Sequence, residues 1–262
     1  MSGWTFPGWR GGFYPKGLPQ KQELAFAATQ VTSIEINGTF YRVQKPSSFK
    51  AWYDATPKNF VFSLKAPQYV THIRRAIDVE TPIANFLASG VFLLKEKLGP
   101  LLWQFPPNLT LKDNRIEKLA ALLPKTPAQA AKLAARHSDW LDASAVTSAR
   151  GVKQIRHAFE FRHPSFFNKD FLQILRAHGI AIVFAHGGDP ELFTQDPTAA
   201  FVYCRMHGEG RDYTKGYAPK TLRAWTKTLQ SLRVPEAFVY FDTEKKKFSP
   251  QDARNFIAIT GG

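Results

Sequence analysis

The feature that most constrains the fold is a series of short apolar segments, separated by helical stretches, that recurs along the whole chain. Each segment is rich in aliphatic, β-branched or aromatic residues and ends in polar ones, which is typical of a buried strand. Strands that alternate with helices form a parallel sheet. We predict eight strands: Gly3 to Thr5, Ser33 to Asn37, Phe60 to Lys65, Leu101 to Gln104, Ala158 to Arg162, Ile180 to Ala185, Phe201 to Met206 and Phe238 to Asp242.

Eight strand-helix units in 262 residues average about 33 residues each, which favours an α/β fold of the (β/α)8 TIM-barrel type over an open doubly wound sheet. The chain has no linker or composition break, so we expect one domain over residues 1–262. The first strand should be short or incomplete, and the stretch 187–200 is too turn-rich for an ordinary helix. We expect helices over 20–28, 115–123, 171–178, 222–232 and 250–259, and an additional one over 128–136.

Composition narrows the class of protein further. The chain has 44% apolar residues, enough for a large core, and neither a signal peptide nor a membrane span is recognisable, so we expect a cytoplasmic protein. Its single cysteine, Cys204, excludes an intramolecular disulfide and a thiolate metal cluster. A net charge of +14 favours attraction to phosphates or other acidic partners.

Polar residues occur near the carboxyl ends of the predicted strands, where the active sites of parallel barrels lie. Because side chains alternate along a strand, the polar residues of one strand share a face. We therefore expect a mixed-charge mouth, with Cys204 on the opposite, helix-facing side as an inert core residue. The residues predicted to point inward are Glu35, Asn37, Lys65, Gln104, Glu160, Arg162, Arg205, His207 and Asp242.

Several uncommon strings occur in a fixed order along nearly the whole chain. The sequence at 35–42 reads Glu-Ile-Asn-Gly-Thr-Phe-Tyr-Arg, and the sequence at 97–107 reads Lys-Leu-Gly-Pro-Leu-Leu-Trp-Gln-Phe-Pro-Pro. With these strings the chain closely resembles the family called domain of unknown function 72, or YecE-like proteins. The other strings are Gly3-Trp4, Gly11 to Pro15, Trp52 with Thr56-Pro57, Phe60 to Lys65, Thr71-His72, Glu160 to His163 and Tyr203 to Gly208.

The resemblance implies a barrel but no activity, since the family has no settled biochemical role. Its barrel is similar in outline to those of sugar isomerases and abasic-site endonucleases, which is an analogy of fold alone. The chain departs from the family pattern at His186, where an acidic residue is common, and at Thr243-Glu244, which replaces a usual Asn-Asp pair.

For the mouth we assign Glu35, Glu160 and His207 to catalysis, because a carboxylate beside an arginine stays ionised and can act as a base. The alternative is a structural ion-pair network that fills the top of the barrel. Lys65, Arg162 and Arg205 would hold an anion, and His72 is either a ligand or a loop residue that packs. The complete set of expected ligand-binding residues is Trp4, Asn37, Tyr41, Lys65, His72, Gln104, Arg162, His163, Arg205 and Asp242.

Other chemistries are less favoured. A glycosidase of the commonest barrel type needs carboxylates on the fourth and seventh strands, which end here in Gln104 and in Arg205-Met206-His207. No motif for an organic cofactor, a serine esterase or a P-loop is present. A divalent metal is an alternative that the sequence does not favour, because its plausible ligands are few.

Basic residues gather in two segments. Residues 42–75 contain seven Lys and Arg and one acid, and residues 205–233 contain seven and two; the second segment includes Gly208, Gly210, Arg211 and Lys215, near where many barrels bind phosphate. We therefore expect a small anionic or phosphate-bearing ligand, with hydrolysis or isomerisation as the reaction if the protein is an enzyme. The alternative is a nucleic-acid binding or repair accessory protein that grips phosphates with this basic, aromatic-rich arc.

Overall fold

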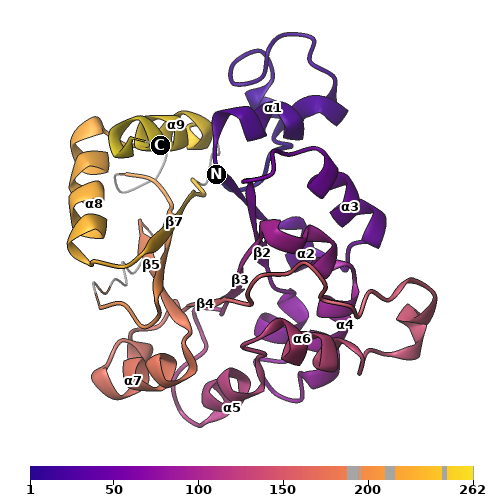
Figure 1. Cartoon of the computed structure of the whole chain (residues 1–262). Helices are drawn as coiled ribbons and strands as arrows, with labels where there is room; N and C mark the ends of the chain where they lie inside the picture. Colours follow the sequence, from indigo (N-terminus) through magenta and orange to yellow (C-terminus); the bar gives the residue numbers. More distant parts are fainter. Residues whose placement is uncertain (188–193, 195, 210–215, 244–246, 262) are drawn as a thin grey trace.

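The computed structural model describes residues 1–187, 194, 196–209, 216–243 and 247–261. Within these residues, seven parallel strands pair in chain order and form a nearly closed barrel, which confirms the predicted TIM-like fold (Figure 1). Seven of the eight predicted strands overlap observed ones. The strands are β1 (Ser33–Ile36), β2 (Val61–Lys65), β3 (Leu98–Gln104), β4 (His157–Glu160), β5 (Ala181–His186), β6 (Phe201–Met206) and β7 (Glu236–Phe241).

Helices surround the strands (Figure 1), and each predicted helix overlaps an observed one. The α-helices are α1 (Glu23–Gln30), α2 (Gly38–Tyr41), α3 (Pro46–Asp54), α4 (Glu80–Ala88), α5 (Arg115–Leu122), α6 (Pro127–Ala134), α7 (Lys169–His178), α8 (Pro219–Ser231) and α9 (Ser249–Thr260). The shorter helical turns are η1 (Pro7–Trp9), η2 (Gln20–Gln22), the π-helix η3 (Tyr69–Ile73), η4 (Val91–Lys97), η5 (Asp139–Ser144) and η6 (Pro164–Phe166). Residues 188–193 and 195, in the stretch where we expected no ordinary helix, lie outside the described part.

The opening segment differs from the prediction of a strand over Gly3 to Thr5. Only Ser2 pairs with β1, opposite Glu35. The Ser2 amide donates to the carbonyl of Phe241 on β7 at 3.2 Å, and the Gly3 amide donates to the carbonyl of Glu35 at 2.8 Å. Gly3 has a φ of +72°, which turns the chain out of the sheet, so that pairing stops there. Ser2 therefore lies between β1 and β7, bridging to Glu35 and donating one hydrogen bond to the last residue of β7.

The side chains form two apolar layers. The outer layer packs between strands and helices and includes Cys204, as predicted; burial raises the pKa of its thiol. The inner layer fills the barrel and includes Tyr203 and Tyr240. Because neighbouring residues of β6 enter different layers, Arg205 must face the interior like Tyr203.

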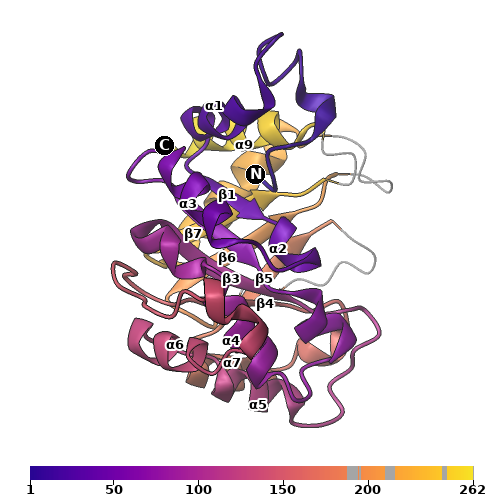
Figure 2. The same ribbon diagram turned by 90° about the vertical axis from the view of Figure 1, so that its right-hand side faces the viewer.

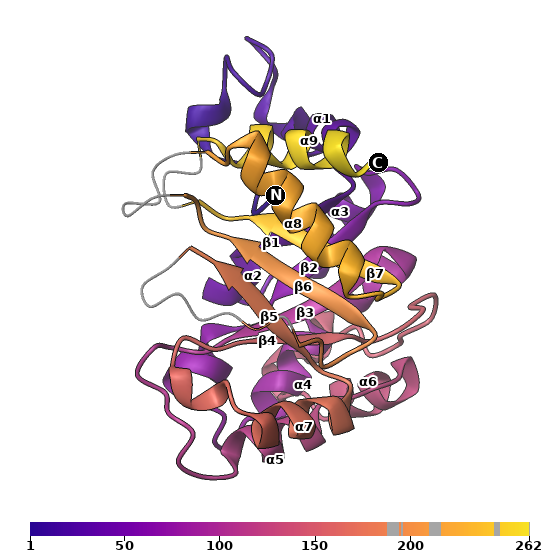
Figure 3. The ribbon, with the colours of Figure 1, turned by 90° about the vertical axis from the view of Figure 1, so that its left-hand side faces the viewer.

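Local sequence signals explain where several helices begin and end. Thr126 and Gln129 form a reciprocal capping box at the start of α6, and the Asn168 side chain accepts a hydrogen bond from the Phe171 amide at the start of α7. Gly179 ends α7 in the left-handed conformation. Figure 2 shows α1 and α9 side by side near the amino terminus, and Figure 3 shows β5, β6 and β7 ending toward the same side. That side is called the mouth below.

Candidate functional site

A buried arginine links its own strand to β1, to β4 and to the end of β7 at the mouth. Arg205 on β6 is 1% exposed, and its guanidinium contacts Glu35 on β1 at 2.9 and 3.1 Å, Glu160 on β4 at 3.0 Å, and Asp242, which follows β7, at 2.5 Å. These four residues are called the Arg205 cluster. Burial alone would lower the pKa of Arg205, but the three carboxylates raise it well above its ordinary value. The guanidinium therefore stays charged.

The Glu35 carboxylate accepts hydrogen bonds from side chains in the barrel interior. The Tyr203 hydroxyl donates to this carboxylate at 2.6 Å, and the Ser2 hydroxyl donates at 3.2 Å. Ser63 extends this network, since its hydroxyl lies 2.7 Å from that of Tyr203. Burial, and next the charge of Glu35, raise the pKa of Tyr203 well above its ordinary value, so its proton stays in the network. The Glu35 carboxylate is thus surrounded by donors and fully buried.

Glu160 is shared between two arginines. Arg162 forms an ion pair with it from the side of the mouth, while Arg205 contacts it from within. Burial alone would raise the pKa of Glu160, but Arg205, Arg162 and His207 lower it well below its ordinary value. The Arg162 guanidinium also lies 2.9 Å from Nε2 of His207, which must accept, so Nδ1 of His207 carries the proton toward the carbonyl of Asp242.

Lys65, at the end of β2, is a second buried cation, 9% exposed. Its ammonium lies 4.1 Å from the centre of the Phe40 ring, and within the described residues it has no hydrogen bond or ion pair. Burial, and next the charge of Arg205, lower the pKa of Lys65 to about 8; the three carboxylates oppose this shift from a distance. Lys65 thus lacks the ionic partners that every member of the Arg205 cluster has.

His72, on η3, lies near Lys65, because both side chains contact the Phe40 ring. Its ring meets the Phe40 ring edge to face at 5.1 Å, and its Nδ1 is 2.9 Å from the Thr71 hydroxyl. Burial, and next the nearby Lys65 charge, lower the pKa of His72. Its Nε2 has no hydrogen bond among the described residues. A neutral imidazole therefore stands next to the lysine amine.

Of the other residues singled out from the sequence, two lie beside the Arg205 cluster and three lie outside it. The Asn37 amide donates to the Ser2 hydroxyl beside Glu35, and Gln104 ends β3 in register with Glu160. Trp4 packs edge to face on Trp52, Tyr41 is 70% exposed on the rim, and the Nδ1 of His163 contacts Ser165 and caps η6. Arg211 and Lys215, which the sequence placed in a basic segment, lie outside the described residues.

Sequence reasoning missed the polar layer beneath the mouth. Tyr203 and Tyr240 lie two residues before Arg205 and Asp242, and Ser33 and Ser63 lie two residues before Glu35 and Lys65. The hydroxyls of Ser33 and Tyr240 are 2.6 Å apart, and those of Ser63 and Tyr203 are 2.7 Å apart. The same alternation, applied to the preceding inward-facing residue of each strand, would have predicted this layer.

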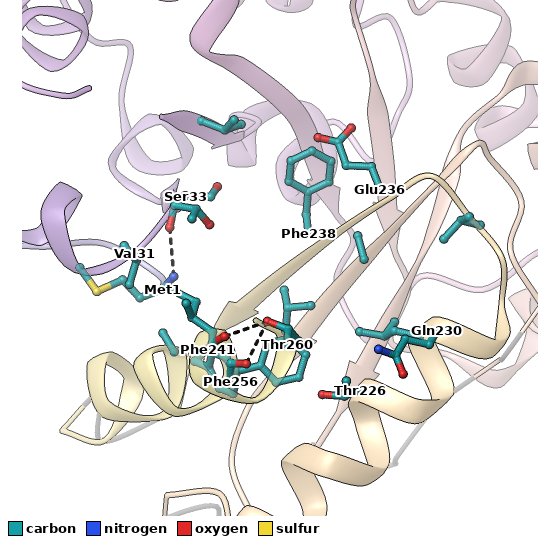
Figure 4. Close-up of a pocket in the computed structure, with 18 of the residues that line it drawn as sticks. Met1, Val31, Ser33, Thr226, Gln230, Glu236, Phe238, Phe241, Phe256 and Thr260 are labelled. Atoms are coloured by element: carbon teal, nitrogen blue, oxygen red, sulfur yellow. Dashed lines mark hydrogen bonds between the residues drawn. The ribbon is translucent and has the colours of Figure 1, made fainter. Parts of the chain in front are cut away.

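A cavity of about 480 Å³ lies away from this chemistry, near the amino ends of β1, β2 and β7 (Figure 4). Met1, Phe238, Phe256 and residues of α8 line it. Its acid, Glu236, is already paired with Arg156, so the cavity lacks the convergent polar groups of a catalytic site.

Two searches concern only the described residues. No group of three or more His, Cys, Asp or Glu side chains there is arranged to hold a metal ion; in the Arg205 cluster a guanidinium occupies the centre of the three carboxylates. No helix of this part is long and apolar enough to cross a membrane.

The fold and the mouth define a class of parallel-barrel protein with a buried ion cluster at the carboxyl ends of its strands. The chain belongs to the family "Protein of unknown function DUF72", whose model matches residues 1–262. A curated relative, the UPF0759 protein YunF of Bacillus subtilis (strain 168), is 28% identical over 124 residues, which cover 45% of this chain and 43% of the relative. The match thus spans less than half of that relative's length.

Solved structures share the fold. A DUF72 family protein from Thermotoga maritima MSB8 superposes with a TM-score of 0.78 at 24% identity, covering 100% of this chain and 98% of that one. A DUF72 family protein from Enterococcus faecalis V583 has a TM-score of 0.75 at 16% identity, covering 100% and 94%. SacUVDE is more distant, with a TM-score of 0.51 at 11% identity over 92% and 86% of the two chains.

Proposed function

We propose that the mouth binds a small anionic, phosphate-bearing ligand and hydrolyses or isomerises it. The observation that carries this proposal is the Lys65 ammonium, which is buried without an ion pair or hydrogen bond among the described residues. A buried charge without a partner is costly, so an anion that supplies the partner is strongly favoured. The carboxylates of the Arg205 cluster cannot fill this place, because each already contacts Arg205.

In this proposal the residues of the mouth divide by exposure. Arg162 retains some exposed surface and joins Lys65 and His72 as ligands of the anion, while His207, which accepts a hydrogen bond from Arg162, orients its guanidinium. Arg205 and Glu35 are too deeply buried and too fully hydrogen-bonded to reach a ligand, so they position Glu160 and Asp242. This replaces the base role that the sequence suggested for Glu35 with a positioning role.

Proton transfer falls to the groups that face the ligand. Glu160 is as deeply buried as Arg205, and both ring nitrogens of His207 are engaged, so these two residues position Arg162. His72 keeps an Nε2 without a hydrogen bond among the described residues, so its ring can accept or pass a proton. Lys65, with a pKa of about 8, is close enough to neutrality to give or accept a proton near physiological pH. Both hydrolysis and isomerisation need such an acid-base pair beside a bound anion.

The test is isothermal titration of the protein with inorganic phosphate, comparing the wild type with Lys65→Met and Lys58→Met. Lys58 is an exposed lysine before β2 and serves as the matched control. We expect Lys65→Met to weaken binding by about tenfold or more, about 1.4 kcal/mol, while Lys58→Met leaves binding unchanged. Equal binding by all three proteins would show that Lys65 does not hold the anion.

A second candidate function, nucleic-acid binding, is favoured by one surface. Tyr41, Tyr69 and Ile73 are exposed on α2 and η3, next to Arg42 and Arg75, and these five residues are called the aromatic rim. Phe40 joins the two elements, since its ring contacts both Tyr41 and His72. Exposed aromatic rings among arginines suit stacked bases between phosphates.

Fluorescence anisotropy with single-stranded, duplex and abasic-site DNA at low and physiological salt tests this candidate. We expect Tyr41→Ala with Arg42→Ala to weaken binding that discriminates among the DNAs, because each stacked base contributes about 1–3 kcal/mol. Trp140→Ala, at an equally exposed aromatic on η5, is the control. Binding that is weak, erased by salt and insensitive to the rim variant would remove the candidate.

A further inference from the structure

Two buried lysines in the molecule are held in opposite ways. Lys97 uses its ammonium hydrogens on the carbonyls of Tyr53 and Thr56 and on the Thr56 hydroxyl, at 2.6, 2.7 and 3.1 Å. These acceptors hold the ammonium form in place. The Lys65 nitrogen lies over the face of Phe40 and has neither a hydrogen-bond acceptor nor a donor among the described residues, so its lone pair would be free there once the proton has left.

The surroundings of Lys65 suit an amine nucleophile. Phe40 desolvates one side of the nitrogen, and Arg205 contributes a repelling positive charge. With a pKa of about 8, roughly a tenth of Lys65 is neutral at pH 7, compared with less than about one part in a thousand for an ordinary lysine. The strand end places the amine at the mouth, where barrel enzymes hold their reacting groups.

We infer that Lys65 forms an imine with an aldehyde or ketone group of the phosphate-bearing ligand; this inference rests on the proposed function and names its substrate class. The Lys65 nitrogen attacks the carbonyl carbon, and the carbonyl electron pair moves to oxygen, which becomes a hydroxyl. The hydroxyl then leaves as water, carrying with it the two protons of the neutral amine, while a carbon-nitrogen double bond forms. No oxidant or reductant is needed.

His72 is placed to move the protons of this reaction. Its ring packs against the same Phe40 ring as Lys65, and its free Nε2 can pass a proton between the amine and the departing oxygen. Once protonated, the imine withdraws electrons and acidifies a neighbouring carbon-hydrogen bond, which is the step that an isomerisation requires. The Lys65 ammonium would first attract the phosphate of the ligand, and Arg162 would then hold the phosphate while the neutral amine of Lys65 reacts with the carbonyl.

Reductive trapping tests this inference on the wild-type chain. The protein is incubated with glycolaldehyde phosphate, or with glycolaldehyde as the probe without phosphate, then reduced with sodium borohydride, and the modified peptide is located by mass spectrometry. We expect Lys65 to carry the main adduct with glycolaldehyde phosphate, at least tenfold above exposed lysines such as Lys58. Inorganic phosphate should suppress this adduct, and Lys65→Arg, which keeps the charge, should abolish it while Lys58→Arg does not.

The outcomes separate the two proposals. If phosphate binds in the titration but the adducts spread over exposed lysines and leave Lys65 unmodified, the imine is wrong and the anion site stands. If Lys65 is modified equally by both probes and phosphate does not compete, the nucleophile stands and the phosphate-bearing ligand is wrong. Because the trapping uses the unaltered chain, neither result depends on whether a variant folds.

Discussion

Arg205 and Lys65 are both buried cations at the mouth of the same barrel, yet their surroundings are opposite. Arg205 contacts the carboxylates of Glu35 on β1, Glu160 on β4 and Asp242 after β7, and tyrosine and serine hydroxyls in turn donate to Glu35. Lys65 lies on an aromatic ring without an acceptor in the described part. The comparison teaches that burial of a charge does not by itself indicate function.

The difference lies in what each charge lacks. The Arg205 cluster is complete, so it joins β1, β4, β6 and the end of β7 and needs no ligand. The Lys65 ammonium has no ionic or hydrogen-bonding partner among the described residues, and an anionic ligand would supply one. Two buried cations at one mouth therefore differ in whether the described residues supply them with partners, and this difference is the basis for proposing a ligand at Lys65 and none at Arg205.

The largest expected effect comes from removing the cation of the complete cluster. Arg205→Met leaves three carboxylates without their common partner, and we expect it to lower the free energy of unfolding by about 3–5 kcal/mol. Urea denaturation followed by circular dichroism measures this loss. The matched control is Arg205→Met combined with Glu35→Gln, Glu160→Gln and Asp242→Asn, which should recover part of the stability. A loss below about 1 kcal/mol would show that the cluster is not an ionic joint.

Removing the Lys65 cation should raise the free energy of unfolding, the opposite of the effect expected at Arg205. Its folded pKa of about 8 lies below the ordinary value of 10.5, so at pH 7 the charged form destabilises the folded state by up to about 3 kcal/mol. Lys65→Met should therefore be more stable than the wild type at pH 7. Between pH 8 and 10.5 the folded wild type binds fewer protons than the unfolded chain, so its stability should rise toward that of the variant. A stability difference that does not change from pH 7 to 10.5 contradicts this expectation.

A smaller effect separates two interior tyrosines. Tyr203→Phe removes a donor to the Glu35 carboxylate and should cost about 1.5–3 kcal/mol, because hydrogen bonds to charged groups are the stronger ones. Tyr240→Phe removes a bond to the neutral Ser33 hydroxyl and should cost about 1 kcal/mol. Thermal unfolding of both variants measures the difference. Equal losses would show that the Glu35 charge gains nothing from Tyr203.

The repeated strand-helix pattern was sufficient to predict the barrel and seven of its strands, because burial on both faces makes each short strand segment almost continuously apolar. The opening strand was wrong in extent, since the turn at Gly3 is a backbone conformation that any glycine permits but none requires. Alternation along each strand correctly placed Glu35, Glu160, Arg205 and Asp242 inside the barrel. It could not show which of these side chains are paired, because alternation gives the direction of a side chain and not the distances between side chains.

The sequence by itself determined the order of strands and helices, the inward face of each strand and the excess of positive charge. These follow from periodicity and composition, which are local properties. Only the tertiary structure decided that Arg205 is fully paired while Lys65 is not. Pairing depends on which strand ends meet across the barrel and on how many oxygen atoms reach each cation, and those distances are properties of the closed fold.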